Sequence, residues 1–179
     1  MSRHPGCYAG VLVGRASGVL MGMLCYDPFI FTVEGALTDF ECEHFRKIAS
    51  NSPNMIKSTV AKFDKKTNKR GLLSDVRTSS HCWVSHSHDQ ITKDVGNRIS
   101  GLVRAPLSHA EFYNVLHYAE GQEYQPHFDT FDPFVDDNAH YLKNGGQRII
   151  TVMAYLNDVE QGGETKFPTI DKIVIPKKG

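Results

Sequence analysis

The sequence has no excess of charge of either sign. Its 179 residues include 20 Lys and Arg and 20 Asp and Glu, so the formal net charge at pH 7 is zero. A protein that binds nucleic acid or an anionic membrane through its overall field carries a basic excess. The charge balance excludes that mode of binding, and we expect no nucleic-acid partner.

Cysteine is sparse, and its spacing carries no metal or disulfide signature. The four cysteines lie far apart and form no Cys-x-x-Cys pair; they are Cys7, Cys25, Cys42 and Cys82. Zinc sites and disulfide frameworks depend on close or repeated cysteine spacing. Neither is indicated, and the redox compartment stays open.

Long apolar runs are absent after residue 26. Residues 9–26 are apolar and Gly-rich, with Arg15 as their only charge. We interpret residues 1–26 as a leader, either a signal or anchor segment or a disordered one. Arg15 is costly at mid-membrane, and no Ala-x-Ala-like cleavage site stands out. If the leader is an anchor, we expect a membrane contact and the endoplasmic reticulum; otherwise we expect the cytoplasm.

The rest of the chain, residues 27–179, has the pattern of one α+β domain. A capping-box pattern at Thr38–Glu41 and apolar residues at helical spacing predict helices over 39–50 and 88–103. Alternating or β-branched runs predict strands near 27–33, 111–118, 123–129, 148–156 and 172–175. Two helices followed by short antiparallel strands are typical of a jelly-roll with flanking N-terminal helices.

The most informative stretch is the tripeptide His127-Phe128-Asp129. In an extended strand, side chains at positions i and i+2 point to the same face, so this imidazole and this carboxylate should converge on one metal ion. They supply two of the three ligands of the 2-His-1-carboxylate triad, which leaves open positions on Fe(II) for oxygenase chemistry.

The motifs around this tripeptide resemble a known family. From residue 27 to 179 the chain is similar to the prolyl 4-hydroxylase group of Fe(II)/2-oxoglutarate dioxygenases. The resemblance is carried by Arg77-Thr-Ser79, Tyr118-x-x-Gly121-Gln-x-Tyr124-x-x-His127-x-Asp129, Gly145-Gly-Gln-Arg148-x-x-Thr151-Val-x-x-Tyr155-Leu156 and Asp158-Val-x-x-Gly162-Gly-Glu-Thr165-x-Phe167-Pro168. It implies a double-stranded β-helix that holds one iron ion.

The resemblance also implies roles for individual residues. His127 and Asp129 would be catalytic iron ligands, and Tyr118 and Thr151 would contact 2-oxoglutarate. Substrate-binding residues would be Arg77, Ser79 and Trp83, although Arg77 has an alternative role as a brace for its own loop. The implied cofactors are Fe(II), 2-oxoglutarate as co-substrate and L-ascorbate. The implied partner is a proline-rich peptide or protein, whose proline is converted to 4-hydroxyproline.

Two features depart from the family pattern. Ser80-His81-Cys82 stands where a Ser-Gly continuation is common, which leaves substrate preference open. The family's third iron ligand, a distal His, and the Lys that pairs with 2-oxoglutarate are also missing, so we expect a dioxygenase domain incomplete at its C-terminus, with weak iron binding and little or no turnover. The alternatives are a non-catalytic peptide-binding module, a decayed paralogue, or a dioxygenase with another substrate. The oligomeric state is open.

Overall fold

The computed structural model describes residues 20–64, 69–134, 138–143 and 145–179. The chain divides into two compact units. The first comprises Met1–Cys42 together with Ala154–Gly179, and the second comprises Glu43–Met153. Helix α1, Asp39–Ser50, begins in the first unit and continues into the second.

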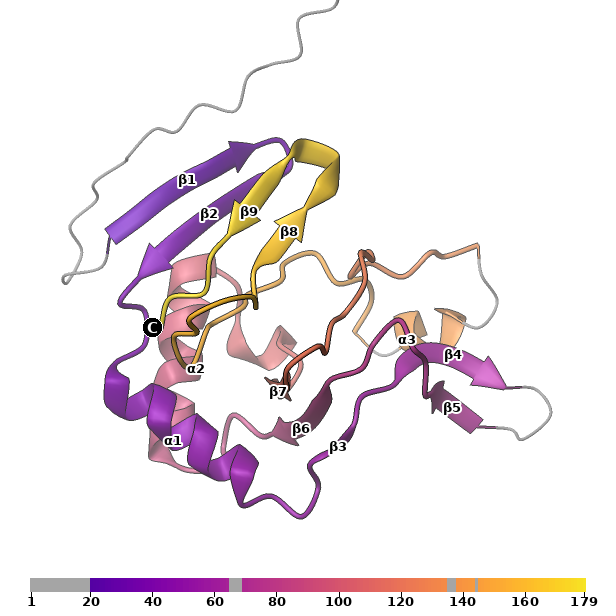
Figure 1. Ribbon diagram of the computed structural model, residues 1–179, viewed down its shortest axis with the longest axis horizontal. Helices are drawn as coiled ribbons and strands as arrows, with labels where there is room; N and C mark the ends of the chain where they lie inside the picture. Colours follow the sequence, from indigo (N-terminus) through magenta and orange to yellow (C-terminus); the bar gives the residue numbers. More distant parts are fainter. Residues whose placement is uncertain (1–19, 65–68, 135–137, 144) are drawn as a thin grey trace, which may run out of the picture. The chain divides into compact units, whose positions relative to one another are not determined.

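The first unit is built from two antiparallel hairpins (Figure 1). Strand β1, Leu20–Tyr26, pairs with β2, Phe29–Glu34. Strand β8, Thr165–Phe167, pairs with β9, Lys172–Val174, across the 3-10 helix η3, Pro168–Ile170. Strand β1 lies inside the stretch that the sequence assigns to a leader, so residues 20–26 form β structure; residues 1–19 of that prediction lie outside the described residues.

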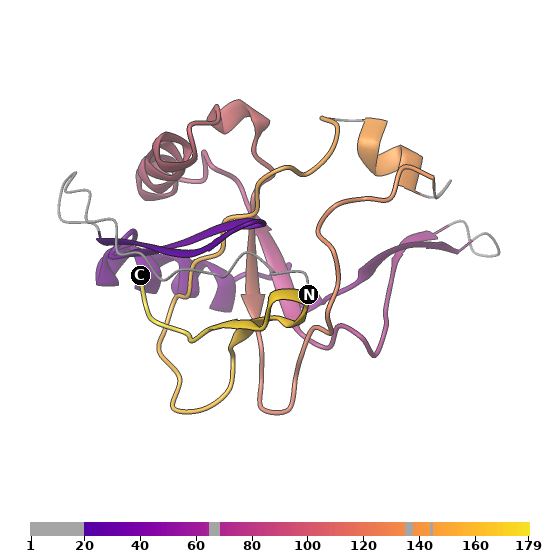
Figure 2. The same ribbon diagram turned by 90° about the horizontal axis from the view of Figure 1, so that it is seen from above.

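The second unit contains a three-stranded antiparallel sheet. Its strands are β3, Ile56–Lys57, β6, Ser80–Val84, and β7, Tyr113–His117, in the order β3-β6-β7. A separate hairpin of β4, Val60–Asp64, and β5, Lys69–Leu72, projects beyond this sheet in both views (Figures 1 and 2). The unit also holds α2, Gln90–Val103, the 3-10 helix η1, Leu107–His109, and α3, Ala139–Lys143.

The three-stranded sheet has two unlike faces. Because side chains alternate along a strand and directly paired residues share a face, one face carries Cys82, Val84 and Val115, all less than 8% exposed. The other face carries large apolar side chains that are more than a third exposed: Ile56, Trp83 and Leu116. The sheet is therefore packed on one side and open on the other.

Helix α1 has the predicted bounds, and one side of it is buried. The capping box is present, since the Thr38 backbone N–H donates to Glu41 Oε2 at 2.7 Å and the Glu41 N–H donates to Thr38 Oγ1 at 3.2 Å. Phe45 is 3% exposed, whereas Phe40 is 69% exposed. The buried stripe runs through Glu41, Cys42, Phe45 and Ala49, and Phe40 lies outside it.

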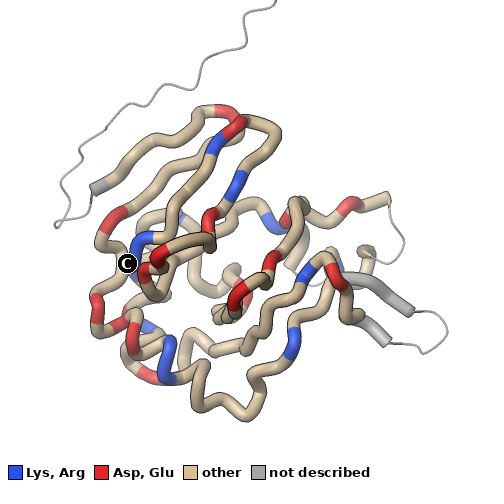
Figure 3. The backbone as a smooth tube through the Cα atoms, in the orientation of Figure 1, with Lys and Arg blue, Asp and Glu red and all other residues tan. Residues whose placement is uncertain are grey.

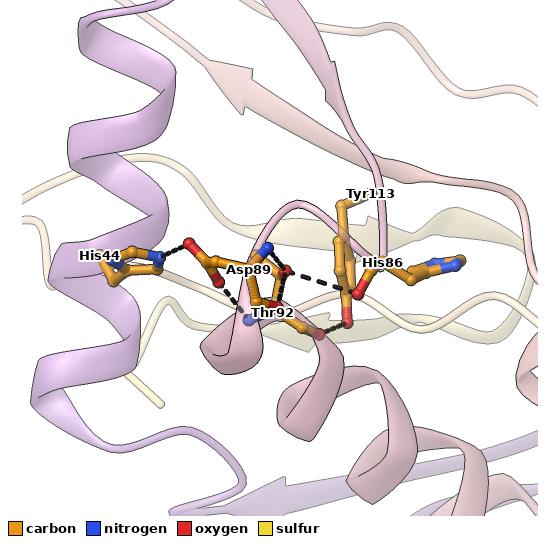
Figure 4. A network of polar contacts seen from close by, with 5 residues as sticks. All are labelled: His44, His86, Asp89, Thr92 and Tyr113. Carbon is orange, nitrogen blue, oxygen red and sulfur yellow. Dashed lines mark hydrogen bonds and ion pairs between the residues drawn. The ribbon is translucent and has the colours of Figure 1, made fainter.

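Helix α2 begins two residues later than predicted, at a cap made by Asp89 (Figure 4). Asp89 Oδ1 accepts from the Thr92 N–H at 2.9 Å, and the Asp89 N–H donates to Thr92 Oγ1 at 3.0 Å. His44 of α1 donates from Nε2 to Asp89 Oδ2 at 2.6 Å. On the far side, the Tyr113 hydroxyl donates to the Thr92 carbonyl at 2.8 Å. One carboxylate thus ties α1 to the start of α2.

We expect Asp89→Ala to destabilise the second unit by about 1–2 kcal/mol, the usual cost of losing an N-cap acceptor. Burial alone would raise the pKa of Asp89, but hydrogen bonds from Thr92 and His44 outweigh it and hold the pKa below its ordinary value. A depressed carboxyl pKa stabilises the fold above the unfolded pKa of about 3.9, and this contribution is lost as the pH falls through the folded value.

Urea unfolding of both proteins across this pH range measures the effect. The difference between wild type and Asp89→Ala should be full at pH 6 and should shrink below about pH 3.9, where the wild-type carboxylate becomes protonated. Asp94→Ala provides the control, because this residue lies on the exposed face of the same helix. If the difference in unfolding free energy between wild type and Asp89→Ala stays constant into strong acid, the ionised Asp89 carboxylate is not the capping group.

Two predicted strands are not formed. Residues 123–129 and 148–156 each make a single isolated bridge, Arg77 with Tyr124 and Tyr155 with Lys178. A strand is stabilised by a ladder to its neighbours, and no described segment supplies one here. Apolar side chains along the second segment are consequently exposed, for example Ile149 at 86%. The described chain is a mixture of helices and antiparallel sheets in which no closed jelly-roll is formed.

Charged residues of both signs are interspersed along the backbone (Figure 3). This distribution matches the balanced composition of the whole chain. Among the described residues, no helix combines the length and the apolar character that crossing a bilayer requires.

Candidate metal centre

The side chains of His127 and Asp129 converge, as their spacing predicts. His127 Nε2 lies 3.4 Å from Asp129 Oδ1, and the two side chains are 37% and 43% exposed. The backbone at both residues is irregular rather than a strand. Convergence is therefore a local property of this loop and does not depend on the missing ladder.

The His127 ring has a defined tautomer. Its Nδ1 lies 2.8 Å from the carbonyl oxygen of Gln125, and because a carbonyl can only accept, Nδ1 carries the hydrogen. In a neutral ring, the Nε2 lone pair then faces a carboxylate oxygen. Two acceptors at 3.4 Å repel unless a cation lies between them.

A proton or a divalent metal ion can supply that cation. Nitrogen and oxygen ligands lie about 2.1 Å from such a metal, so two ligand atoms 3.4 Å apart can share one ion. A backbone carbonyl that accepts from Nδ1 is the usual outer partner of a metal-bound His. His127 and Asp129 thus fit a ferrous ion in donor type, spacing and tautomer.

Thr151 contacts the same carboxylate. Its hydroxyl donates to Asp129 Oδ2 at 2.6 Å, so both oxygens of Asp129 have a neighbour and Oδ1 is the one directed at His127. The sequence interpretation gives Thr151 a contact with 2-oxoglutarate. The structure places it on the iron-ligand candidate, with its oxygen lone pairs still able to accept.

Gln147 and Arg148 hold the Thr151 segment beside Asp129. Gln147 Nε2 donates to the Phe131 carbonyl at 2.7 Å, and Gln147 Oε1 accepts from the Phe131 N–H at 2.8 Å. Arg148 stacks over the Phe131 ring at 4.7 Å and makes a bidentate ion pair with Glu111, at 2.5 and 2.8 Å. Hydrogen bonding to Glu111 raises the pKa of Arg148 above its ordinary value.

Tyr124 contacts both the candidate metal ligand His127 and Arg77. Its ring stacks on His127 with centroids 3.5 Å apart, and the Arg77 guanidinium lies 4.8 Å from the centre of the same ring. Burial raises the pKa of the Tyr124 phenol, so it is neutral at pH 7. Sequence reasoning did not assign Tyr124 a role, although its place three residues before His127 in the motif was the available signal.

The remaining predicted residues are dispersed. Arg77 Nη1 donates to the Thr59 carbonyl at 3.0 Å, which agrees with the alternative role as a loop brace. Ser79 is fully buried, and its hydroxyl donates to Ser58 Oγ at 2.9 Å, so it presents no surface to a peptide. Trp83 is 49% exposed on the open face of the sheet, and Tyr118 is 42% exposed just after β7.

The structure thus brings together His127, Asp129 and Thr151, with Arg77 joined through Tyr124. Among the described residues, no group of three or more His, Cys, Asp or Glu side chains is arranged to hold a metal ion. The candidate centre consists of the His127 imidazole, the Asp129 carboxylate and the groups that orient them.

Comparison with known proteins shows which proteins this chain is similar to. The sequence profile of the 2OG-Fe(II) oxygenase superfamily matches residues 113–179. Probable prolyl 4-hydroxylase 8 of Arabidopsis thaliana is 43% identical over 146 residues, which is 82% of this chain and 47% of the relative. Prolyl 4-hydroxylase 5 of the same plant is 42% identical over 147 residues, again 82% of this chain and 47% of the relative. The chain is thus similar to prolyl 4-hydroxylases over most of its length, and its C-terminal part matches the 2OG-Fe(II) oxygenase superfamily.

The matched region of this prolyl 4-hydroxylase-like chain contains the candidate centre. His127, Asp129 and Thr151 all lie within residues 113–179. The superfamily implies Fe(II) and 2-oxoglutarate as the groups used. A third relative, probable prolyl 4-hydroxylase 3 of Arabidopsis thaliana, is 42% identical over 156 residues, or 87% of this chain and 51% of the relative. The chain spans about half the length of the curated relatives it matches.

Proposed function

We propose that this protein is an Fe(II)- and 2-oxoglutarate-dependent dioxygenase that hydroxylates peptidyl proline to 4-hydroxyproline. The observation that carries the proposal is the convergence of His127 Nε2 and Asp129 Oδ1, which lie 3.4 Å apart in a loop where the Gln125 carbonyl accepts from His127 Nδ1. Relatives at about 40% identity that carry the name prolyl 4-hydroxylase support the reaction type. L-ascorbate is the proposed auxiliary reductant.

His127 and Asp129 are the residues that would hold the ferrous ion. When bound together with 2-oxoglutarate, that ion supplies the activation of O2 that hydroxylation requires. The protein's own part is orientation. The Gln125 carbonyl keeps the hydrogen on Nδ1 so that Nε2 is available, and Thr151 holds Asp129 so that Oδ1 points the same way.

Tyr118 and Thr151 are the proposed contacts of 2-oxoglutarate. Both carry a hydroxyl, and the co-substrate presents carboxylate and keto oxygens that accept hydrogen bonds. The Thr151 oxygen already lies next to the candidate iron ligand, since it is 2.6 Å from Asp129 Oδ2. Tyr118 follows the end of β7 and is 42% exposed.

The proposed dioxygenase domain is residues 27–179, together with β1. We infer that this domain is a double-stranded β-helix in which the segments 123–129 and 148–156 pair with neighbouring strands. Pairing would cover apolar side chains along these segments that are now exposed, such as Ile149 at 86% and Val152 at 50%. Burial of such surface contributes about 25 cal/mol per Å2.

The proposed partner is a proline-rich peptide in the polyproline II conformation. Such a peptide presents apolar rings and free carbonyl groups, which suit the half-exposed Trp83 ring and the Arg77 guanidinium. Ser79 would act indirectly, because its buried hydroxyl contacts Ser58 and not the surface.

The test is turnover with a proline-rich peptide in the presence of Fe(II), 2-oxoglutarate, ascorbate and air. We expect a gain of one oxygen atom on a proline of the peptide, with succinate formed in equal amount. Mass spectrometry of the peptide and succinate quantification measure both products. Oxygen found on a different residue type would overturn the proline assignment and favour another substrate.

The alternative function is non-catalytic peptide binding, for which the half-exposed Trp83 ring and the Arg77 guanidinium would suffice. Peptide bound without any gain of oxygen, although Fe(II) and 2-oxoglutarate are present, would establish it and overturn the dioxygenase proposal.

A further inference from the structure

The open face of the β3-β6-β7 sheet carries His81, a polar residue that no assigned role uses. His81 lies at the centre of this face, paired in register with Ile56 on one side and Leu116 on the other. It is only 6% exposed, whereas Ile56 and Leu116 are 56% and 37% exposed. The imidazole is therefore set among accessible apolar side chains.

A chain of hydroxyl groups fixes the His81 ring. Ser79 Oγ donates to Ser58 Oγ at 2.9 Å, and Ser58 Oγ lies 3.1 Å from His81 Nδ1. Because Ser58 accepts the hydrogen of Ser79, its own hydrogen is free to be donated to Nδ1. Burial and the nearby Arg77 charge lower the pKa of His81, so the ring is neutral at pH 7. A neutral ring that accepts at Nδ1 carries its hydrogen on Nε2.

The Nε2–H donor is directed away from Ser58, since the two ring nitrogens point to different sides of the imidazole. The ring meets Trp83 edge-on, with centroids 5.9 Å apart. Two other polar atoms nearby are buried and have no hydrogen-bond partner among the described residues: Arg77 Nε, and Oδ1 of Asn114, which pairs with Trp83 in register. An unpaired buried polar group is costly, so this region of the sheet is suited to receive a polar ligand.

We propose that His81 is a specificity-determining residue that donates its Nε2–H to a backbone carbonyl of an extended, proline-rich peptide whose pyrrolidine ring packs on Trp83. The chemistry of the peptide and that of the sheet face are complementary. Proline has no N–H to donate, and the carbonyls of a polyproline II helix have no internal partners. Such a peptide therefore needs N–H donors on an apolar surface. The inference rests on the proposed function for its substrate class.

Trp83 makes the test direct, because it is the only tryptophan in the chain. We expect a short oligoproline peptide to shift the Trp83 emission to shorter wavelength as it covers the ring, and this shift gives a dissociation constant without any catalysis. His81→Phe keeps an aromatic ring but removes the donor. It should weaken binding about tenfold, which corresponds to one hydrogen bond of about 1.4 kcal/mol.

Two further variants complete the design. His81→Asn keeps a polar group near Ser58 but is too short to reach the peptide, so it should weaken binding by a similar factor and shows the effect if His81→Phe does not fold. His117→Gln is the matched control, because His117 lies on the opposite face of the same sheet, paired with Ser80. It should leave the dissociation constant unchanged.

The outcomes separate the two proposals. Wild-type affinity in both folded His81 variants would overturn the role of His81 while leaving the peptide-modifying function intact. A peptide that never shifts the emission of the wild-type protein would overturn the substrate class and, with it, both proposals. Loss of binding in His117→Gln as well as in the His81 variants would show a general structural effect and would also overturn the specific role.

Discussion

Asp129→Ala should lower the affinity of the protein for Fe(II) by more than about 100-fold. Loss of an outer-shell partner alone typically costs 10–100-fold in metal affinity, and this substitution removes a proposed ligand. It also leaves His127 Nε2 without the carboxylate oxygen that now lies 3.4 Å away. Anaerobic calorimetric titration with Fe(II) measures the dissociation constant for both proteins.

His140→Ala is the control for this titration. His140 is an exposed residue of α3 and could bind iron adventitiously, but it belongs to no metal-binding group among the described residues. We expect its substitution to leave Fe(II) affinity unchanged. If Asp129→Ala and His127→Ala both bind Fe(II) as tightly as wild type, the candidate centre is wrong.

Phe45→Ala should destabilise the second unit by about 3–5 kcal/mol, the usual range for truncating a buried phenylalanine. Phe45 is 3% exposed and meets Tyr113 edge-on at 4.9 Å between ring centroids. Tyr113 in turn contacts the start of α2, and burial raises its pKa to about 12. The substitution thus opens a cavity where α1, α2 and the packed face of the sheet are joined.

Phe40→Ala on the same helix provides the comparison. Phe40 is 69% exposed, so its truncation should cost no more than about 0.5 kcal/mol. Urea unfolding followed by far-ultraviolet circular dichroism gives both values. Equal destabilisation by the two substitutions would mean that the buried face of α1 is not the stripe through Phe45.

The helices could be predicted because their signals are local. The capping residues of α1, Thr38 and Glu41, lie three positions apart, and the structure confirms the contacts between them. Which side of α1 is buried was harder, since Phe40 and Phe45 are equally apolar. That choice depends on Tyr113, which lies far away in sequence.

The strands over 123–129 and 148–156 illustrate the opposite case. Their composition favours β structure, but a strand forms only with a partner, and none of the described residues provides one. Ser79 shows the same limit for a single residue. Its motif indicated a peptide contact, whereas the fold buries its hydroxyl against Ser58.

The order of residues alone placed an imidazole and a carboxylate two positions apart and so predicted that they would meet, and they do meet, although in an irregular loop and not in the extended strand that the prediction assumed. Only the tertiary structure decided how that pair is held: Gln125 sets the His127 tautomer, Thr151 orients Asp129, and Tyr124 stacks between His127 and Arg77. Two of these four contacts, Thr151 with Asp129 and Arg77 with Tyr124, join segments more than 20 residues apart, so they exist only once the chain has folded.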